Sequence, residues 1–199
     1  MGTITQVQKS ILLGLVLGDG YIRKFPGRKN ALLEVNHSFK QKEYVDWLYG
    51  QLKNLVKTPP KARDGNGGRI AYRFFMKQHS VITELMQYFY RDRLKIVPKG
   101  IQIDEIALAI WFIDDGSSSG GSFYLNTQKF DLTSQENLTS VLKNKFEITT
   151  RLNRDKSYWR IRINKESKQK FQSLIEPLII PSMRYKLGYR PVETSHKHE

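Results

Sequence analysis

The stretch LLGLVLGDG, residues 12–20, is an apolar run that ends in Asp-Gly, and LAIWFIDDG, residues 108–116, repeats the pattern in the middle of the chain. An apolar segment of about two or three helical turns that stops at a Gly is typical of a buried helix whose C-terminus lies at the Asp. The helix dipole is negative at that end, so a carboxylate there costs a few tenths to about 1 kcal/mol unless a cation offsets it. Two such carboxylates in one chain predict a shared cation between two helices that pack side by side.

These two stretches resemble the paired motifs of the LAGLIDADG homing endonucleases, in the single-chain, two-motif form that group I introns encode. In the nine-letter pattern, Asp19 and Asp115 both fall on the second Asp, which is the metal-binding carboxylate of that family. A third stretch, IEPLIIPSMRYKL at residues 175–187, resembles the closing segment of the same proteins. The resemblance covers nearly the whole chain.

The two motifs differ at two positions. Position three is Gly14 in the first copy and Ile110 in the second, so the close helix approach that two small residues would allow is only half provided. Position seven is Gly18 in the first copy and Asp114 in the second. We therefore expect two non-equivalent active sites, in which Gly18 and Asp114 are candidate metal contacts beside Asp19 and Asp115. Whether Asp114 contacts metal or only solvent is left open.

Hydrophobic periodicity and turn residues predict the remaining elements, and the second half of the chain repeats the order of the first. The expected strands span 21–25, 32–39, 70–76, 123–128, 147–153 and 158–164; the expected helices span 43–56, 80–91, 131–145 and 165–178; a Ser/Gly turn is expected at 117–122. The resemblance implies an α+β fold of two pseudosymmetric αββαββα half-domains whose antiparallel sheets form a DNA-binding saddle. The half-domains would span 1–98 and 99–190, followed by a tail at 191–199.

Composition points to a polyanionic partner. The chain of 199 residues carries 33 Lys and Arg against 19 Asp and Glu, which gives a net charge of +14 and a pI near 9.9. Double-stranded DNA is the first candidate partner, since a charge of this size is typical of nucleic-acid binding. A membrane surface is disfavoured because the basic residues are spread along the chain instead of forming one amphipathic anchor. The absence of Cys excludes disulfides, Cys-ligated zinc and thiol catalysis.

The sequence also limits where the protein acts. The longest apolar runs, 11–17 and 106–113, are much shorter than the roughly 20 residues that span a bilayer. The N-terminus resembles neither a signal peptide nor a transit sequence. We therefore expect a soluble, intracellular monomer that acts at DNA, in an organellar or prokaryotic genome, and its compartment is left open.

Phosphodiester hydrolysis needs a nucleophilic water and neutralisation of the charge that grows on the phosphate, and Mg²⁺ held by carboxylates supplies both. Mg²⁺ accepts one or two protein carboxylates, which Asp19 and Asp115 can offer, with Mn²⁺ or Ca²⁺ as substitutes for binding. The four His residues are scattered, so zinc is not expected. Lys95 and Lys186, in the similar stretches RLKI and RYKL, match the basic active-site residue of the family.

Gln41 and Gln128, in the similar stretches FKQK and NTQK, resemble the family's water-positioning residue, although a role as plain helix-flanking residues is equally compatible with the sequence.

Basic residues alternate with core residues along the predicted strands, and such a basic face can follow the major groove. Which of these residues contact bases and which contact phosphates is left open. The predicted DNA-binding residues are Arg23, Arg28, Asn36, Lys61, Arg63, Arg69, Arg73, Tyr124, Asn126, Arg151, Arg154, Arg160 and Arg162.

The sequence thus predicts a site-specific endonuclease that makes a double-strand break in a long asymmetric DNA site, and the resemblance implies 3′ overhangs. The main alternative is an RNA-binding intron maturase of the same fold, with or without nuclease activity. A non-cleaving DNA-binding regulator is a weaker alternative because it has no need of paired carboxylates at a helix interface. The nuclease insert of an intein is disfavoured because no splicing segments flank the motifs.

Overall fold

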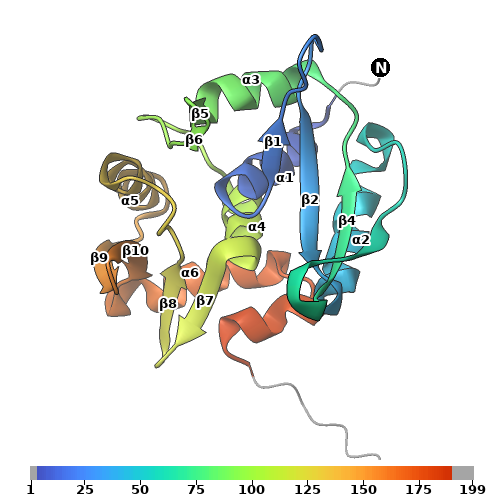
Figure 1. Ribbon diagram of the computed structural model, residues 1–199. Helices are drawn as coiled ribbons and strands as arrows, with labels where there is room; N and C mark the ends of the chain where they lie inside the picture. The colour runs from blue at the N-terminus through green and yellow to red at the C-terminus, as the bar shows by residue number, and fades with distance from the viewer. Residues whose placement is uncertain (1–3, 190–199) are drawn as a thin grey trace, which may run out of the picture.

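The two apolar motifs form helices α1 (Gln6–Leu17) and α4 (Glu105–Asp115), which pack against each other at the centre of the molecule (Figure 1). The structure is a computed structural model that describes residues 4–189, so the predicted tail at 191–199 lies outside the described residues. Side-chain caps begin both helices: Thr5 accepts from the Gln8 amide in a capping box, and Asp104 accepts from the Ala107 amide. The Ser10 hydroxyl on α1 also donates to Asp104, so the two N-termini are joined.

The predicted order αββαββα occurs twice. The first half contains α1, β1 (Tyr21–Arg23), β2 (Leu32–Ser38), α2 (Lys42–Leu52), β3 (Lys61–Asp64), β4 (Ile70–Phe75) and α3 (Ser80–Phe89). The second half contains α4, β7 (Gly116–Ser119), β8 (Ser122–Leu125), α5 (Leu132–Phe146), β9 (Thr150–Asp155), β10 (Tyr158–Ile163) and α6 (Lys168–Ile175). Between them lies a small ribbon of β5 (Tyr90–Arg91) and β6 (Leu94–Lys95). Short 3₁₀ turns complete the chain at η1 (Phe39–Gln41), η2 (Lys53–Leu55), η3 (Asn66–Gly68), η4 (Lys165–Ser167), η5 (Glu176–Leu178) and η6 (Pro181–Leu187).

The two halves have the same sheet topology. One antiparallel sheet has the strand order β1-β2-β4-β3 and the other has the order β7-β8-β10-β9. The registers also match, because Tyr21 pairs with Glu34 where Ser117 pairs with Tyr124. The fold prediction is therefore confirmed, and the register gives a residue-by-residue correspondence between β2 and β8.

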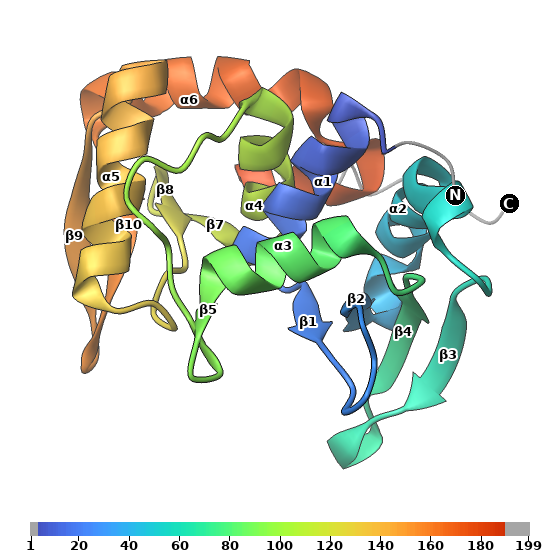
Figure 2. The same cartoon turned by 90° about the horizontal axis from the view of Figure 1, so that it is seen from above.

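The sheets lie on either side of the central helix pair (Figures 1 and 2). Helix α2 packs on β2 and β4, and α5 packs on β9 and β10, so each sheet has one face covered by its own helix. Buried side chains from both halves form one continuous hydrophobic core. The boundary at residue 98 stays a prediction, since the core alone does not divide the chain there.

Two local expectations are wrong. The Ser/Gly segment 117–122 is not a plain turn, because β7 and β8 pair across it and only Gly120 and Gly121 turn the chain, both with positive φ. Cross-strand hydrogen bonds override the low strand propensity of Ser and Gly here. The alternation of basic and core residues along strands 70–76 and 158–164 predicts that Ile70 and Trp159 face the core, but they are 48% and 42% exposed. Both lie near hairpin ends, where strand alternation continues beyond the buried core.

No helix among residues 4–189 has the length and apolar character that a membrane span requires.

Candidate active site

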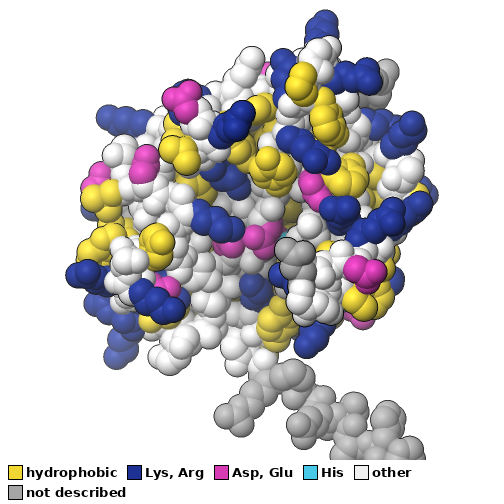
Figure 3. All heavy atoms as spheres, in the orientation of Figure 1, with side chains coloured by type: hydrophobic (Ala, Val, Ile, Leu, Met, Phe, Trp, Pro, Cys, Tyr) yellow, Lys and Arg dark blue, Asp and Glu magenta, His cyan; other side chains and the backbone are white. Residues whose placement is uncertain are grey.

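Asp19 and Asp115 lie at the ends of the paired helices, as the sequence predicts. Asp115 is the last residue of α4, and Asp19 follows the α1 C-cap Gly18. Burial, and then the nearby charge of Asp19, raise the pKa of Asp115 to about 7. The side chain of Asp19 is 37% exposed. In Figure 3, acidic side chains lie at the middle of the face, with Lys and Arg side chains around them.

The close approach of the helices depends on two glycines of the first motif, Gly14 in α1 and its C-cap Gly18. A Cβ on Gly14 would lie 2.6 Å from the Ile110 Cβ, and a Cβ on Gly18 would lie 2.4 Å from the Asp114 Cβ. Both distances are far below van der Waals contact, so the two small residues of the first motif make room for the two larger residues of α4. The expectation of a half-provided approach is therefore wrong, because one small residue at each contact is sufficient.

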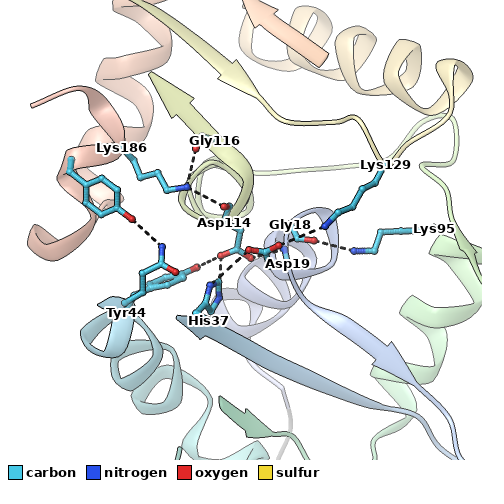
Figure 4. A network of polar contacts seen from close by, with 11 residues as sticks. Gly18, Asp19, His37, Tyr44, Lys95, Asp114, Gly116, Lys129 and Lys186 are labelled. Carbon is cyan, nitrogen blue, oxygen red and sulfur yellow. Dashed lines mark hydrogen bonds and ion pairs between the residues drawn. The ribbon is translucent and has the colours of Figure 1, made fainter. Parts of the chain in front are cut away.

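Asp114 is buried between the two halves and does not face solvent, since its side chain is 0% exposed. Its Oδ1 accepts from the Tyr44 hydroxyl at 2.8 Å, and its Oδ2 accepts from the Asp19 amide at 3.1 Å (Figure 4). Burial, and then the charge of Asp19, raise the pKa of Asp114 to about 7. The geometry shows that Asp114 holds the backbone of Asp19, and its contact with metal stays a prediction.

Lys95 and Lys186 occupy equivalent positions in the two halves. The Lys95 ammonium donates to the carbonyls of Gly18 and Gly20, at 3.1 and 3.2 Å. The Lys186 ammonium donates to the carbonyls of Asp114 and Gly116, at 3.2 and 2.9 Å. These are motif positions seven and nine in both cases, and the two lysines lie on opposite sides of the aspartates (Figure 4). Burial lowers the pKa of Lys95 to about 8 and also lowers the pKa of Lys186.

The two glutamines are not equivalent. Gln41 in η1 donates to the Tyr185 hydroxyl at 3.0 Å, beside Lys186 in the sequence. Gln128 donates to Asp155 at 2.9 Å. The sheet register aligns Gln128 with Ser38, so the correspondence drawn from FKQK and NTQK is wrong. The first half has an additional 3₁₀ turn after β2, which displaces Gln41 along the chain. A catalytic role for either glutamine stays a prediction.

Sequence reasoning missed two residues near Asp19. His37 is 4% exposed, and its Nδ1 lies 3.9 Å from Asp19 Oδ2 while its Nε2 lies 3.7 Å from Asp114 Oδ1. Burial lowers the pKa of His37, against the opposing effect of Asp19. The available signal was its place on the apolar face of β2, between Val35 and Phe39. The second missed residue is Lys129, whose Nζ lies 4.0 Å from Asp19 Oδ1.

The chemistry of these residues fits a divalent cation. Three carboxylates lie near the helix ends, and the pKa values of Asp114 and Asp115 are raised first by burial and then by the negative charge of Asp19. The two lysines donate to backbone carbonyls, so they do not neutralise a carboxylate by direct contact. Among residues 4–189 no group of three or more His, Cys, Asp or Glu side chains forms a preassembled cage. Mg²⁺ needs only one or two carboxylates, so Asp19 and Asp115 are a sufficient set.

We expect Asp115→Asn to stabilise the metal-free protein above neutral pH. The folded-state pKa of about 7 lies above the ordinary 3.8, so the protonated carboxyl favours folding and this contribution is lost as the pH rises through about 7. The free energy of unfolding of the variant should therefore exceed that of wild type by about 1–3 kcal/mol at pH 8, and the two values should match near pH 4. Thermal unfolding in EDTA at both pH values measures the difference, and an equal difference at both would contradict the prediction.

The open faces of the two sheets carry most of the predicted DNA-binding residues. In the first sheet, Asn36 pairs with Arg73, and the Arg73 guanidinium contacts Glu34 at 3.1 Å. The guanidinium of Arg23 lies 5.0 Å from the centre of the Phe25 ring. A pocket reaches from Asp19 along this face to Arg69.

The second sheet holds its basic residues on an aromatic ring. The Arg160 guanidinium lies 4.1 Å from the centre of the Tyr124 ring and donates to Asn126 Oδ1 at 3.3 Å. Arg162 donates to the Ser122 hydroxyl at 2.6 Å. These contacts fix the guanidinium groups before any ligand is present.

The remaining predicted residues lie around these faces. Lys61 and Arg63 on β3 pair with Arg73 and Ala71, and Arg151 pairs with Arg162, so all three share the open faces. Arg28 lies in the exposed β1–β2 turn. Arg154 pairs with Trp159 and packs over its ring at 6.0 Å, on the opposite face from Arg160 and Arg162. The expectation that Arg154 shares their face is wrong, because alternation along β9 reverses its direction.

A family model described as the LAGLIDADG DNA endonuclease family matches residues 9–171. The chain belongs to this family. A relative named "Probable intron-encoded endonuclease 1" from Wickerhamomyces canadensis is 30% identical, over 93% of this chain and 85% of its own length. The solved structure "The homing endonuclease I-WcaI bound to its DNA recognition sequence" superposes with a TM-score of 0.86 and 29% identity, covering 96% of this chain and 89% of the other.

Another relative is named "Cytochrome b mRNA maturase bI2", from Saccharomyces cerevisiae (strain ATCC 204508 / S288c). It is 30% identical over 90% of this chain, and the matched region is 47% of its length. The chain thus spans about half of this relative.

Proposed function

We propose that this chain is a divalent-metal-dependent homing endonuclease that binds a long asymmetric DNA duplex as a monomer and cuts both strands, leaving 3′ overhangs, to promote intron homing. The observation that carries the proposal is the pair of aspartates at the ends of α1 and α4, each flanked by the lysine of its own half. Two basic sheets extend from this centre. Such an arrangement can place one scissile phosphate near each lysine.

Each group at the centre has a defined part in the proposed reaction. Asp19 and Asp115 would hold the metal ion, which when bound supplies an activated water and neutralises charge on the phosphate. Lys95 and Lys186 hold the last turn of each motif through its carbonyls, and their ammonium groups are positioned to stabilise negative charge that develops beside them. The Asp114 carboxylate accepts a hydrogen bond from the Asp19 amide, and this contact holds the backbone that carries the Asp19 carboxylate.

A selection from a large library of randomised duplexes in Mg²⁺, followed by sequencing of the cleaved ends, tests the proposal. The Asp19→Asn/Asp115→Asn double variant, run in parallel, is the control for contaminating nucleases. We expect one long asymmetric site, cut on both strands by wild type only, with 3′ overhangs at the ends. Retention of duplexes without any cleavage would overturn the proposed activity.

DNA binding is expected to weaken steeply with salt, because each phosphate contact releases counterions. If the two basic sheets make about 6–10 phosphate contacts, affinity should fall by roughly 10³–10⁵ between 50 and 200 mM salt. Fluorescence anisotropy with the selected duplex in Ca²⁺, at a series of salt concentrations, measures the slope. A flat response would show that the basic faces are not the binding surface.

RNA binding as an intron maturase is a second candidate, favoured by the maturase name of the yeast relative. The basic faces and fixed guanidinium groups would serve a polyanion of either kind. Competition between the selected DNA duplex and structured group I intron RNA separates the two candidates. Tighter binding to the RNA than to any duplex, with no cleavage, would favour the maturase.

A further inference from the structure

Lys129 is the one basic side chain from the second half that the described structure pairs with the aspartate of the first half. It lies in the connection between β8 and α5, and its Nζ is 4.0 Å from Asp19 Oδ1. The side chain is 80% exposed. Figure 4 shows it extending toward Asp19 from the side opposite His37. Its ammonium therefore lies beside a proposed metal ligand and remains accessible to a phosphate group.

The backbone beneath Lys129 is held firmly. Thr127 is fully buried, and its hydroxyl accepts from the Ile161 amide at 3.2 Å and donates to Gln135 at 2.9 Å. The Phe130 amide donates to the Thr127 carbonyl at 3.0 Å, and Phe130 is itself buried. The attachment point of Lys129 is thus fixed by its neighbours, while its four-carbon stem leaves the ammonium free to follow a ligand.

Lys129 lies on the same side of the centre as Lys95. In Figure 4 these two side chains come from one side of the aspartates, and Lys186 comes from the other. The positive charge of Lys129 acts on both Lys95 and Asp115: it contributes to the lowered pKa of Lys95 and opposes the burial that raises the pKa of Asp115. The charges that act on Lys186 are those of the three aspartates. Lys129 therefore belongs to the surroundings of Lys95.

The other side has no equivalent cation at this position. The register that aligns Tyr124 with Glu34 aligns Lys129 with Phe39, whose ring contacts Tyr72 at 5.6 Å between centres. On the side of Lys186, Gln41 donates to the hydroxyl of Tyr185, which precedes Lys186 in the chain, and the charge of Lys186 acts on the buried His37. The side of Lys95 thus has a second lysine, whereas the side of Lys186 has His37, Gln41 and Tyr185.

We propose that Lys129 contacts the scissile phosphate of one DNA strand only, the strand that Lys95 also serves. This inference rests on the proposed endonuclease function. The ammonium would donate hydrogen bonds to a non-bridging phosphate oxygen and stabilise the charge that grows there during hydrolysis, while water attacks phosphorus and the 3′ oxygen departs. Lys129 itself neither forms nor breaks a covalent bond in this step. The two strands are consequently cut by chemically different centres, and Lys129 is a catalytic residue of one.

Strand-resolved kinetics test this assignment. The probe is the duplex obtained from the library selection, with a different fluorophore on each strand, in saturating Mg²⁺. Lys129→Gln should slow cleavage of one strand by about 10²-fold, a loss typical of removing one group that stabilises developing charge. The cleavage rate of the other strand should stay within about 3-fold of wild type. The slowed strand should be the one that Lys95→Met slows, so Lys129→Gln should accumulate nicked duplex. Lys129→Arg should restore much of the rate because it keeps the charge.

Controls distinguish this effect from general loss of positive charge. Lys143→Gln removes one exposed lysine from α5 and should leave the cleavage rates of both strands unchanged. Binding of Lys129→Gln in Ca²⁺ should stay within about 3-fold of wild type, so that the loss appears in kcat and not in KM. The inference would be overturned if cleavage of both strands slowed equally, if cleavage slowed only for the strand that depends on Lys186, or if neither cleavage rate changed. If wild type cuts neither strand, the proposed function fails as well, and the two failures are thereby distinguished.

Discussion

Asp19→Asn and Asp115→Asn are each expected to abolish double-strand cleavage, with a rate loss of more than about 10³-fold, because each replaces a charged metal ligand by a neutral amide. Asn keeps the size of Asp, so the contact between α1 and α4 is not disturbed. DNA binding, measured in Ca²⁺ with the selected duplex, should remain within about 10-fold of wild type, since the sheets carry the proposed contacts. Cleavage is followed by gel separation of intact, nicked and linear DNA.

Glu136→Gln is the matched control for these substitutions, because it removes one carboxylate from an exposed position on α5. It should leave cleavage and binding unchanged. Full cleavage by either aspartate variant would remove the proposed metal site. Loss of binding together with cleavage would instead show that the aspartates support the structure of the DNA-binding surface.

The sequence predicts the helix pair and the sheets well because those features depend on local signals. Each apolar run leads into an Asp-Gly pair, and an apolar run of this length that stops at such a pair predicts a buried helix. The helices end there without a left-handed glycine, since φ is −95° at Gly18 and −85° at Gly116. The equivalence of Lys95 and Lys186 was also predictable, since each occurs in a similar tetrapeptide in its half. The structure adds that both bind carbonyls at positions seven and nine, a contact that no pattern of residue types specifies.

The neighbours of Asp19 were not predictable because they come from distant parts of the chain and depend on connection lengths. His37 reaches Asp19 from β2, and Lys129 reaches it from the connection after β8. The tetrapeptides FKQK and NTQK suggested that Gln41 and Gln128 correspond, but the register shows an offset of three residues. Local similarity does not reveal such an offset, because the strands after each motif pair according to hydrogen bonding and burial.

Gly18→Ala is expected to lower the free energy of unfolding by about 3 kcal/mol or more, the upper range for overpacking a core. The added Cβ would lie 2.4 Å from the Asp114 Cβ and 2.6 Å from its Oδ2, and both atoms belong to a buried side chain that Tyr44 and the Asp19 amide hold in place. The melting temperature of a chain of this length should fall by roughly 6–12 °C. Thermal unfolding by circular dichroism measures the effect.

Gly50→Ala is the control, because Gly50 lies in α2 and a Cβ there would have no atom within 4 Å. It should stabilise the protein by about 0.5–1 kcal/mol, as expected for glycine replaced in an exposed helix. The double variant Gly18→Ala/Asp114→Gly removes the clashing Cβ and should recover more than about 1 kcal/mol relative to the sum of the single changes. Additive effects would contradict direct contact at position seven. Coupling would show that Gly18 is required because the second motif carries Asp114.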